Sequence, residues 1–449
     1  MSAVEALSPR RVEPLRAGAA LAAIAALLLL AVTMALALYR FPPSWEVVLV
    51  VGVGMVGVLA LAVARYEAAV ALGFLLFGVV AVEPAPPDGV FAVVIAVAMM
   101  TGRFNLERVP MSVFALLGMF VFLNLLSAVE AIDPGAAARF MTITIYLAAF
   151  AVWFTSYLTS ERRARNVLRA YIIPAAFFGL AASLALFVPI PGADAILRYE
   201  GTRATGLFED PNVFGPFLVP AAVIVLQEIL EPRLLGWSRL TKLAVFLVLT
   251  GGVVFSYSRA AWINYAVAVV CLLAVLTVRR GGSRRAFAVL ALLVVTGIGV
   301  AGVLAATGSV EFLQERARLQ SYDVERFGAQ RTGIELAERY PFGIGPGQFD
   351  VVVPISTHST YVRALAEQGI LGLVAIASLF LATLLFAGRN ATLGRDSYGI
   401  GSAALLAAWV GLLVNSFVVD TLHWRHLWFV AALIWVGTMR PRTEFAAPR

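Results

Sequence analysis

Long, uninterrupted apolar runs dominate this chain and recur almost from one end to the other. Runs of about 18 residues or more are long enough to cross the hydrocarbon core of a bilayer as a helix. They lack the alternation of apolar and polar residues that the strands of a membrane barrel show. Because only helices and closed barrels satisfy the backbone hydrogen bonds in lipid, the pattern predicts an all-α, polytopic membrane protein.

The pattern predicts about twelve to fourteen transmembrane helices in a single integral membrane domain that comprises residues 1–449. The candidate spans cover residues 18–39, 45–64, 68–82, 89–101, 110–128, 137–157, 168–189, 212–228, 239–256, 260–278, 286–306, 359–387, 398–418 and 425–440. The first span resembles a signal anchor, because its apolar run is too long for a cleaved signal peptide. Two longer loops interrupt the spans, at 190–211 and 307–357, and the second carries charged residues at helical spacing.

The basic residues assign each loop to one side of the membrane. With the N-terminus in the cytoplasm, every second loop is cytoplasmic, and these loops carry most of the arginines, as at 162–169 and 279–285. The opposite loops at 83–88 and 130–134 are acidic. The positive-inside rule therefore predicts that both termini are cytoplasmic and that the two longer loops lie on the outer side.

The composition agrees with this topology and excludes several other classes of protein. The chain is 61% hydrophobic and only 14% charged, whereas soluble domains are roughly 25% charged. The net charge of +7 lies in short loops, so it reports topology, and we expect no nucleic-acid partner. Cys271 is the only cysteine, which excludes a disulfide framework and a thiolate metal site.

Several arginines on the predicted outer side break the charge bias. They are Arg198, Arg203, Arg259, Arg316, Arg318, Arg326, Arg331 and Arg425. Positive charge retained there indicates an anionic ligand at the outer leaflet, and ordinary ion pairs with nearby acids are the alternative. Arg203, Arg259 and Arg331 are the better ligand candidates, because each lies at or near a span end or a Gly/Pro motif.

Two outer motifs hold arginines next to predicted span ends. The segment 201–212 leads into a span, and Asp210 or Asn212 can cap the helix there. Helix capping does not explain Arg203 in the same segment. The segment 256–262 is a tight turn that contains Arg259. An arginine in so short a connection is costly to dehydrate, so it needs a protein partner or a phosphate.

A third motif brings a histidine to the start of a long apolar helix. The Gly/Pro-rich loop at 341–349 is followed by the segment 357–372, which contains His358, one of only three histidines. A lone titratable side chain at the membrane boundary, near arginines, is a candidate general base. The alternative is a helix N-terminal histidine that hydrogen-bonds to the loop. Tyr361 is expected on the same helical face, where it would orient His358 or an acceptor.

In this order, the motifs resemble the O-antigen ligase and polymerase superfamily of bacterial membrane glycosyltransferases, over roughly residues 200–430. The matching positions are Arg203, Gly206, Pro211, Asn212, Ser258, Arg259, Arg331, Pro341, Gly343, Gly345, His358, Glu367, Gly369, Gly372, Asp420, Arg425 and Trp428. Ser359 departs from the pattern, because the family usually has asparagine after the histidine. The first half of the chain matches only as a series of membrane spans.

The resemblance implies a GT-C-like, inverting enzyme in the lipid bilayer of the bacterial inner membrane, with its active site facing the periplasm. It would move a glycan from undecaprenyl diphosphate to an acceptor hydroxyl on lipid A core or a similar glycolipid or glycan. His358 would be the general base. The diphosphate would be bound by Arg203, Arg259 and Arg331. Supporting roles would fall to Tyr361, Asn212 and Arg425. Because arginines can neutralise the leaving group, we expect neither a metal nor a cofactor.

Other functions are open at this point. A polymerase of the same superfamily would use a second lipid-linked repeat as acceptor. A transporter for lipid-linked sugars should carry charges at mid-membrane, whereas the ionisable residues here gather at the outer ends. A peptidoglycan polymerase of the shape and division type would rely on an outer-loop acid such as Asp210 or Asp323. His423 and His426 have a spacing that can bind metal, but the neighbouring tryptophans favour an interfacial anchoring belt.

Overall fold

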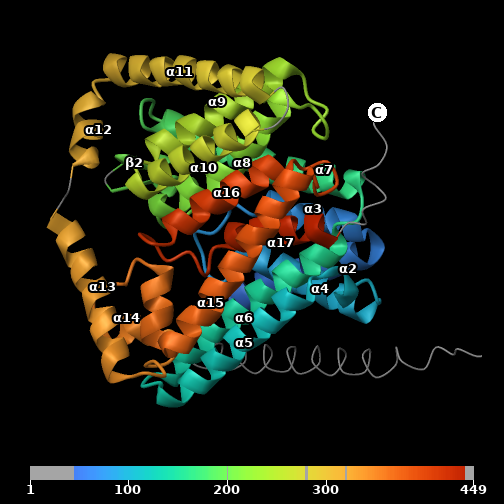
Figure 1. Ribbon diagram of the computed structural model, residues 1–449, viewed down its shortest axis with the longest axis vertical. Coiled ribbons are helices and arrows are strands. Elements are labelled where there is room, and N and C mark those ends of the chain that lie inside the picture. The colour runs from blue at the N-terminus through green and yellow to red at the C-terminus, as the bar shows by residue number, and fades with distance from the viewer. Residues whose placement is uncertain (1–44, 200, 279–281, 319–320, 440–449) are drawn as a thin grey trace, which may run out of the picture.

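The computed structural model describes residues 45–199, 201–278, 282–318 and 321–439 (Figure 1). It is 76% helical, and seven of the described helices are long and apolar enough to cross a membrane, with five shorter apolar helices beside them. This confirms the all-α, polytopic class. The larger count of twelve to fourteen spans stays a prediction, and its first span, 18–39, lies outside the described residues.

The helices follow the predicted apolar runs closely. In the first half they are α2 (Trp45–Ala64), α3 (Tyr66–Leu75), α4 (Pro86–Met100), α5 (Met111–Ser127), α6 (Pro134–Tyr157) and α7 (Glu161–Ala185), with short 3-10 turns η1 (Leu106–Arg108), η2 (Ala128–Glu130) and η3 (Ala193–Ala195). In the second half they are α8 (Pro211–Leu230), α9 (Arg239–Phe255), α10 (Arg259–Val278), α11 (Gly282–Ala306), α12 (Val310–Ala317), α13 (Ser321–Arg339), α14 (Phe349–Val352), α15 (Thr360–Leu393), α16 (Ser402–Asn415) and α17 (Arg425–Met439).

The core of the bundle lies around α8 and an aromatic cluster beside it. Of the apolar window of α8, 83% is buried, because α7, α9, α10 and α16 all pack against this helix. Between α3, α4 and α17, the ring of Phe74 lies 5.1 Å from those of both Phe91 and Phe429. Large apolar side chains packed at this density fix the relative positions of the helices that carry the outer loops.

Polar contacts join the loops at one end of the bundle. There the Arg165 guanidinium on α7 donates a 2.8 Å hydrogen bond to the Leu234 carbonyl, and Arg233 pairs with Asp396 at 2.8 Å. The buried Lys242 ammonium lies 2.8 Å from a carboxylate oxygen of Glu228. These are loops that the charge bias assigns to the cytoplasm, so that end is held together by its own basic residues.

The long loop between α11 and α15 contains three further helices. The sequence 307–357 was predicted to be partly helical, and it forms α12, α13 and α14. In Figure 1, α12 and α13 lie along one edge of the molecule, on the same side as strand β2. α13 packs on α15 at Gly333, where an added Cβ would lie 2.6 Å from Cγ1 of Val362. This packing places α13 beside the start of α15.

A small hairpin occupies the other long loop. Strands β1 (Leu197–Arg198) and β2 (Arg203–Ala204) pair antiparallel, with Arg198 opposite Arg203. The chain then reaches α8 through Asp210, whose carboxylate caps the helix by accepting from the Asn212 amide at 2.8 Å. This confirms Asp210 as the capping residue. The hairpin turns Arg203 back towards the interior of the bundle end, where it is 5% exposed.

Candidate functional site

The Gly/Pro-rich loop at 341–349 is hydrogen-bonded to an opened turn of α15. Gly369 leaves the helical conformation, with φ 69° and ψ −171°, and this frees carbonyls that a regular helix would use. The amides of Ile344 and Gly345 donate to the carbonyls of Ala366 and Glu367, both at 3.0 Å. The loop and the helix therefore form one unit, so the glycine spacing in this motif has a structural cause.

The side chain of Glu367 adds two more hydrogen bonds between α15 and the loop. It is fully buried, and its two oxygens accept from the backbone amides of Gly347 at 2.8 Å and Phe349 at 3.1 Å. The guanidinium of Arg363, one helical turn earlier, lies 3.1 Å away and balances its charge. A buried carboxylate needs such donors, so Glu367 holds the loop in place and faces away from solvent.

Arg363 is the centre of an ionic network near His358. Its guanidinium contacts Asp350 at 2.9 Å and Asp420 at 2.7 Å, in addition to Glu367. It also donates to the hydroxyl of Ser356 at 2.7 Å. The network joins α14, α15 and the turn between α16 and α17. Sequence reasoning missed Arg363, although its i, i+4 spacing to Glu367 was a signal that could have found it.

His358 adopts a strained backbone conformation just outside the helix. Its φ is 47°, a left-handed value that is uncommon for a residue other than glycine. The next two residues fix it there, since the Thr360 amide and the Ser359 hydroxyl both donate to the Ser416 carbonyl, at 3.0 and 3.4 Å. From α13, the Gln330 side chain donates to the His358 carbonyl at 3.5 Å. Strain of this kind clusters at functional sites.

Tyr361 does not share a helical face with His358, so that expectation is wrong. α15 begins at Thr360, so His358, with its left-handed backbone, lies outside the helix. The Tyr361 hydroxyl instead donates to the Leu413 carbonyl at 3.2 Å, and its ring lies 4.4 Å from that of Phe417. Tyr361 therefore joins α15 to α16.

The surroundings of His358 keep its imidazole neutral. Burial is the main cause that lowers its pKa from 6.5 to about 4, and the positive charge of Arg326 on α13 is the next. Arg363 acts in the same direction, whereas the carboxylates of Asp210 and Asp350 oppose it. At neutral pH the side chain is therefore uncharged and able to accept a proton.

The motifs 201–212 and 256–262 contact each other, and Asp210 of the first motif lies near enough to His358 to act on its charge. Arg203 donates to the Ser256 carbonyl at 3.0 Å and to the side-chain oxygen of Asn212 at 3.3 Å. The Ser258 hydroxyl donates to the same Asn212 oxygen at 2.7 Å. The guanidinium of Arg203 also lies 5.1 Å from the ring centre of Tyr199. Asn212 therefore joins two segments that the sequence analysis proposed separately.

Arg203 retains its charge although it is buried. Burial is the main cause that lowers its pKa from 12.5 to about 10, with Arg316 as the second cause and Asp210 opposing both. A pKa of about 10 leaves the guanidinium protonated at neutral pH. These interactions also show that Arg203 and Arg316 lie near enough to repel each other, which favours an anion near them.

Three more arginines surround one tyrosine. Arg259, at the start of α10, and Arg316, on α12, donate to the Tyr322 hydroxyl at 2.9 and 3.1 Å. The Arg326 guanidinium lies 4.9 Å from the ring centre of Tyr322. Asp323 pairs with Arg259 at 2.5 Å. We call Arg203, Arg259, Arg316 and Arg326 the arginine cluster.

Two of the predicted site residues lie elsewhere. Arg331, on α13, forms an i, i+4 ion pair with Glu335 at 3.0 Å, and its side chain is 84% exposed. Arg326 comes five residues earlier, on another face of α13, and its charge, together with that of Arg363, influences His358. Arg425 donates to a carboxylate oxygen of Asp88 at 2.6 Å, so it joins α17 to the start of α4.

The remaining histidines make separate packing contacts. His423 Nε2 lies 2.9 Å from the Thr144 hydroxyl, and its ring packs on Phe140 with 4.4 Å between the ring centres. His426 is buried beside Trp424, with 5.0 Å between their rings. Within the described ranges, no group of three or more histidine, cysteine or acidic side chains could hold a metal ion.

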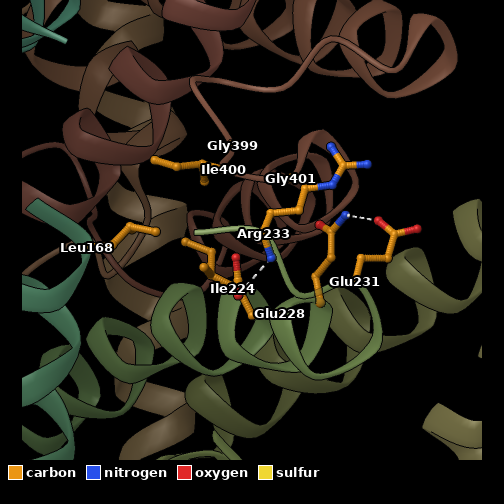
Figure 2. Close-up of a pocket in the computed structure, with 9 residues that line it drawn as sticks. Leu168, Ile224, Glu228, Glu231, Arg233, Gly399, Ile400 and Gly401 are labelled. Atoms are coloured by element: carbon orange, nitrogen blue, oxygen red, sulfur yellow. Dashed lines mark hydrogen bonds between the residues drawn. The ribbon is translucent and has the colours of Figure 1, made fainter. Parts of the chain in front are cut away.

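The pocket shown in Figure 2 lies at the opposite end of the bundle. Its lining comprises Leu168, Ile224, Gln227, Glu228, Glu231, Arg233, Gly399, Ile400 and Gly401. Asn212 lies in the first turn of α8 at the His358 end, and Glu228 lies near the other end of the same helix, about 24 Å away at 1.5 Å per residue. The cavity volume is about 10 Å³, which has room for one water. It is not the candidate site.

Residues 244–377 match a family model described as O-antigen ligase. A comparison with curated proteins gave no significant match. The matched segment contains Arg259, α12, α13 and His358, whereas Arg203 and Asp420 lie outside it. The match supports the resemblance to the O-antigen ligase and polymerase superfamily, and with it an enzyme of that general type.

Proposed function

We propose that the chain is a ligase-type glycosyltransferase with its site at the periplasmic face of the bacterial inner membrane and both termini in the cytoplasm. It transfers a glycan from undecaprenyl diphosphate to an acceptor hydroxyl, on lipid A core or a similar glycolipid. The observation that carries this proposal is the arrangement of His358 beside the arginine cluster, whose members come from four separate elements, β2, α10, α12 and α13.

The charge of the cluster suits a diphosphate. Four guanidinium groups and two nearby carboxylates, Asp210 and Asp323, leave an excess of two positive charges (4 − 2) among these six side chains. A lipid-linked diphosphate carries one negative charge on each phosphate, so the charges match. Arginines placed at the leaving group stabilise the charge that develops there as the glycosidic bond breaks.

His358 takes the acceptor proton. As the acceptor oxygen bonds to the anomeric carbon, its hydroxyl proton moves to the neutral imidazole. The bond from that carbon to the diphosphate oxygen breaks, and the electron pair leaves with the diphosphate. Attack from the opposite face inverts the anomeric centre. Asn212 and the Ser258 hydroxyl hold Arg203 in position for the leaving group.

The fall of kcat/KM at low pH should occur well below the ordinary pKa of histidine. A histidine that acts as a base is active above its pKa, and its catalytic contribution is lost as the pH falls through that pKa. With a pKa of about 4 for His358, we expect kcat/KM, which reports the free enzyme, to stay nearly constant down to about pH 5.5.

The neighbouring charges provide the control for this profile. Arg326 and Arg363 lower the pKa of His358, and Asp210 and Asp350 raise it. Arg326→Gln should therefore move the acid limb upward, towards the unperturbed 6.5. A wild-type profile whose kcat/KM already halves near pH 6.5 would contradict the proposed environment of His358.

Loss of Arg259 should weaken transfer strongly, and loss of Arg331 should not. Removing one charged group aimed at a leaving group costs about 10²–10³-fold in rate, so Arg259→Ala should lower kcat/KM by that order. Arg259→Lys should rescue only partly, because an ammonium lacks the planar fork of the guanidinium. The matched control is Arg331→Ala, expected within about twofold of wild type because exposed ion pairs contribute little. Equal losses in the two alanine variants would remove the distinction.

The reaction itself is tested with purified full-length protein, a lipid-linked oligosaccharide and a candidate acceptor. We expect one glycan transferred to the acceptor. A ladder of growing lipid-linked chains would assign the polymerase reaction of the same superfamily instead. Failure to form either product with any lipid-linked donor would contradict the proposed function.

A further inference from the structure

Asp323 forms an ion pair with Arg259 in the way that a ligand phosphate would. Its carboxylate oxygen lies 2.5 Å from the guanidinium, and the residue is 7% exposed. The ion pair forms between α10 and α13, and the neighbouring Tyr322 accepts from the same guanidinium at 2.9 Å. Carboxylates and phosphates present similar oxygen pairs to arginine, so an incoming diphosphate competes with Asp323 for this group.

The proposed reaction makes release of the product harder than binding of the donor. This step rests on the proposed function. When the anomeric carbon–oxygen bond breaks, both phosphates stay on the lipid, and the oxygen that keeps the electron pair becomes a terminal phosphate oxygen. A terminal phosphate ionises a second time with a pKa near 6. The product diphosphate therefore carries more negative charge than the donor, and the arginine cluster binds it more tightly.

We propose that Asp323 is an internal competitor that returns to Arg259 after each transfer and expels the diphosphate product. Asp323 acts through Arg259 and touches no reacting atom, so it is a positioning residue for product release. Because it is tethered next to the guanidinium, its effective concentration is high at every turnover. While Asp323 is paired with Arg259, that guanidinium cannot bind another anion. The affinity of the empty site for an anion is therefore reduced to the fraction of time for which Arg259 is unpaired.

A purely structural ion pair predicts the opposite sign. Removing one partner of a largely buried pair normally destabilises the fold and leaves the other charge unsatisfied. Such damage weakens ligand binding. Removing a competitor strengthens it. The direction of the change in affinity therefore separates the two roles.

The test uses the purified full chain and inorganic diphosphate as the probe, with binding measured by calorimetry. Asp323→Asn should bind diphosphate about three- to tenfold more tightly than wild type, as expected for an arginine that is paired most of the time. Asp323→Glu should bind like wild type because the competing charge is kept. The matched control is Glu335→Gln on the same helix, which should bind like wild type because Glu335 pairs with the exposed Arg331.

Kinetics give a second measurement. Asp323→Asn should perform a single turnover at the wild-type rate but should slow severalfold over many turnovers, as product accumulates on the enzyme. If this variant does not fold, Asp323→Ser removes the same charge and carries the same expectations.

The outcomes separate this inference from the proposed function. If Arg259→Ala weakens diphosphate binding and Asp323→Asn leaves it unchanged or weaker, the competitor role is overturned and the diphosphate site stands. If Arg259→Ala binds diphosphate like wild type, both are overturned. A loss of single-turnover transfer in Asp323→Asn would assign an acid essential for chemistry and would also overturn the release role.

Discussion

His358→Asn should lose transfer activity by about 10²–10⁴-fold, the usual contribution of a positioned general base. Asparagine is the informative replacement because it tolerates the left-handed backbone that His358 adopts at φ 47°, yet it cannot accept a proton at neutral pH. Binding of the donor should change little, because the arginine cluster carries that interaction. The measurement is single-turnover transfer together with donor affinity for the same preparation.

His423→Gln is the matched control for a lost histidine. Its ring packs on Phe140 and contacts the Thr144 hydroxyl, and both of these residues lie on α6. We expect lower thermal stability but unchanged transfer per folded molecule. If His358→Asn kept activity within about fivefold of wild type, a different group would have to take the acceptor proton, and the role assigned to His358 would be wrong.

Gly369→Ala should prevent stable folding of the site. The backbone at Gly369, with φ 69° and ψ −171°, is in a region that is essentially restricted to glycine. An added Cβ would lie 2.1 Å from the Pro341 carbonyl oxygen, which is backbone and cannot rotate away. Strain and clash together should cost about 3 kcal/mol or more. The expected result is a large fall in the unfolding temperature in detergent, or little folded protein.

Gly388→Ala provides the control on the same helix. Apart from the neighbouring backbone of its own helix, no atom lies within 4 Å of a Cβ added there, and alanine is the better helix former by about 1 kcal/mol. That variant should be as stable as wild type or slightly more so. Equal stability of the two variants would mean that the loop at 341–349 does not depend on the opened turn of α15.

The membrane helices were predictable because the signal is local. Apolar runs of sufficient length determine where the helices form. α8, for example, lies close to its predicted span, and its start is fixed by the Asp210 cap. The pairing of Arg203 with Asn212 was also within reach, because both lie in one short motif. What no local pattern contains is the way that motif meets Ser258 across the bundle.

Arg326 replaces Arg331 in the proposed site for a physical reason. The sequence shows charged residues along this helix, but only packing decides which face meets α15. Tyr322, Arg326 and Gln330 are spaced four apart and share the face that meets the site, whereas Arg331 breaks that spacing. This spacing, read as a helical face, could have selected Arg326 from the sequence.

The Gly/Pro-rich loop was expected only to precede the segment that carries His358, and no local pattern shows what holds the loop in place. In the structure it contacts the opened turn of α15. Gly345 donates to the Glu367 carbonyl, and the Glu367 side chain binds two further amides of the loop. The motif acts on the site through position, because it sets where the segment leading to His358 begins.

The most direct test of the central claim is a cryo-EM structure of the His358→Asn protein with an undecaprenyl-diphosphate-linked oligosaccharide. We predict that the two phosphates contact Arg203, Arg259 and Arg326, with Asp323 displaced from Arg259 and the anomeric carbon facing residue 358. A diphosphate bound away from the arginine cluster, with Arg259 still paired to Asp323, would contradict the account.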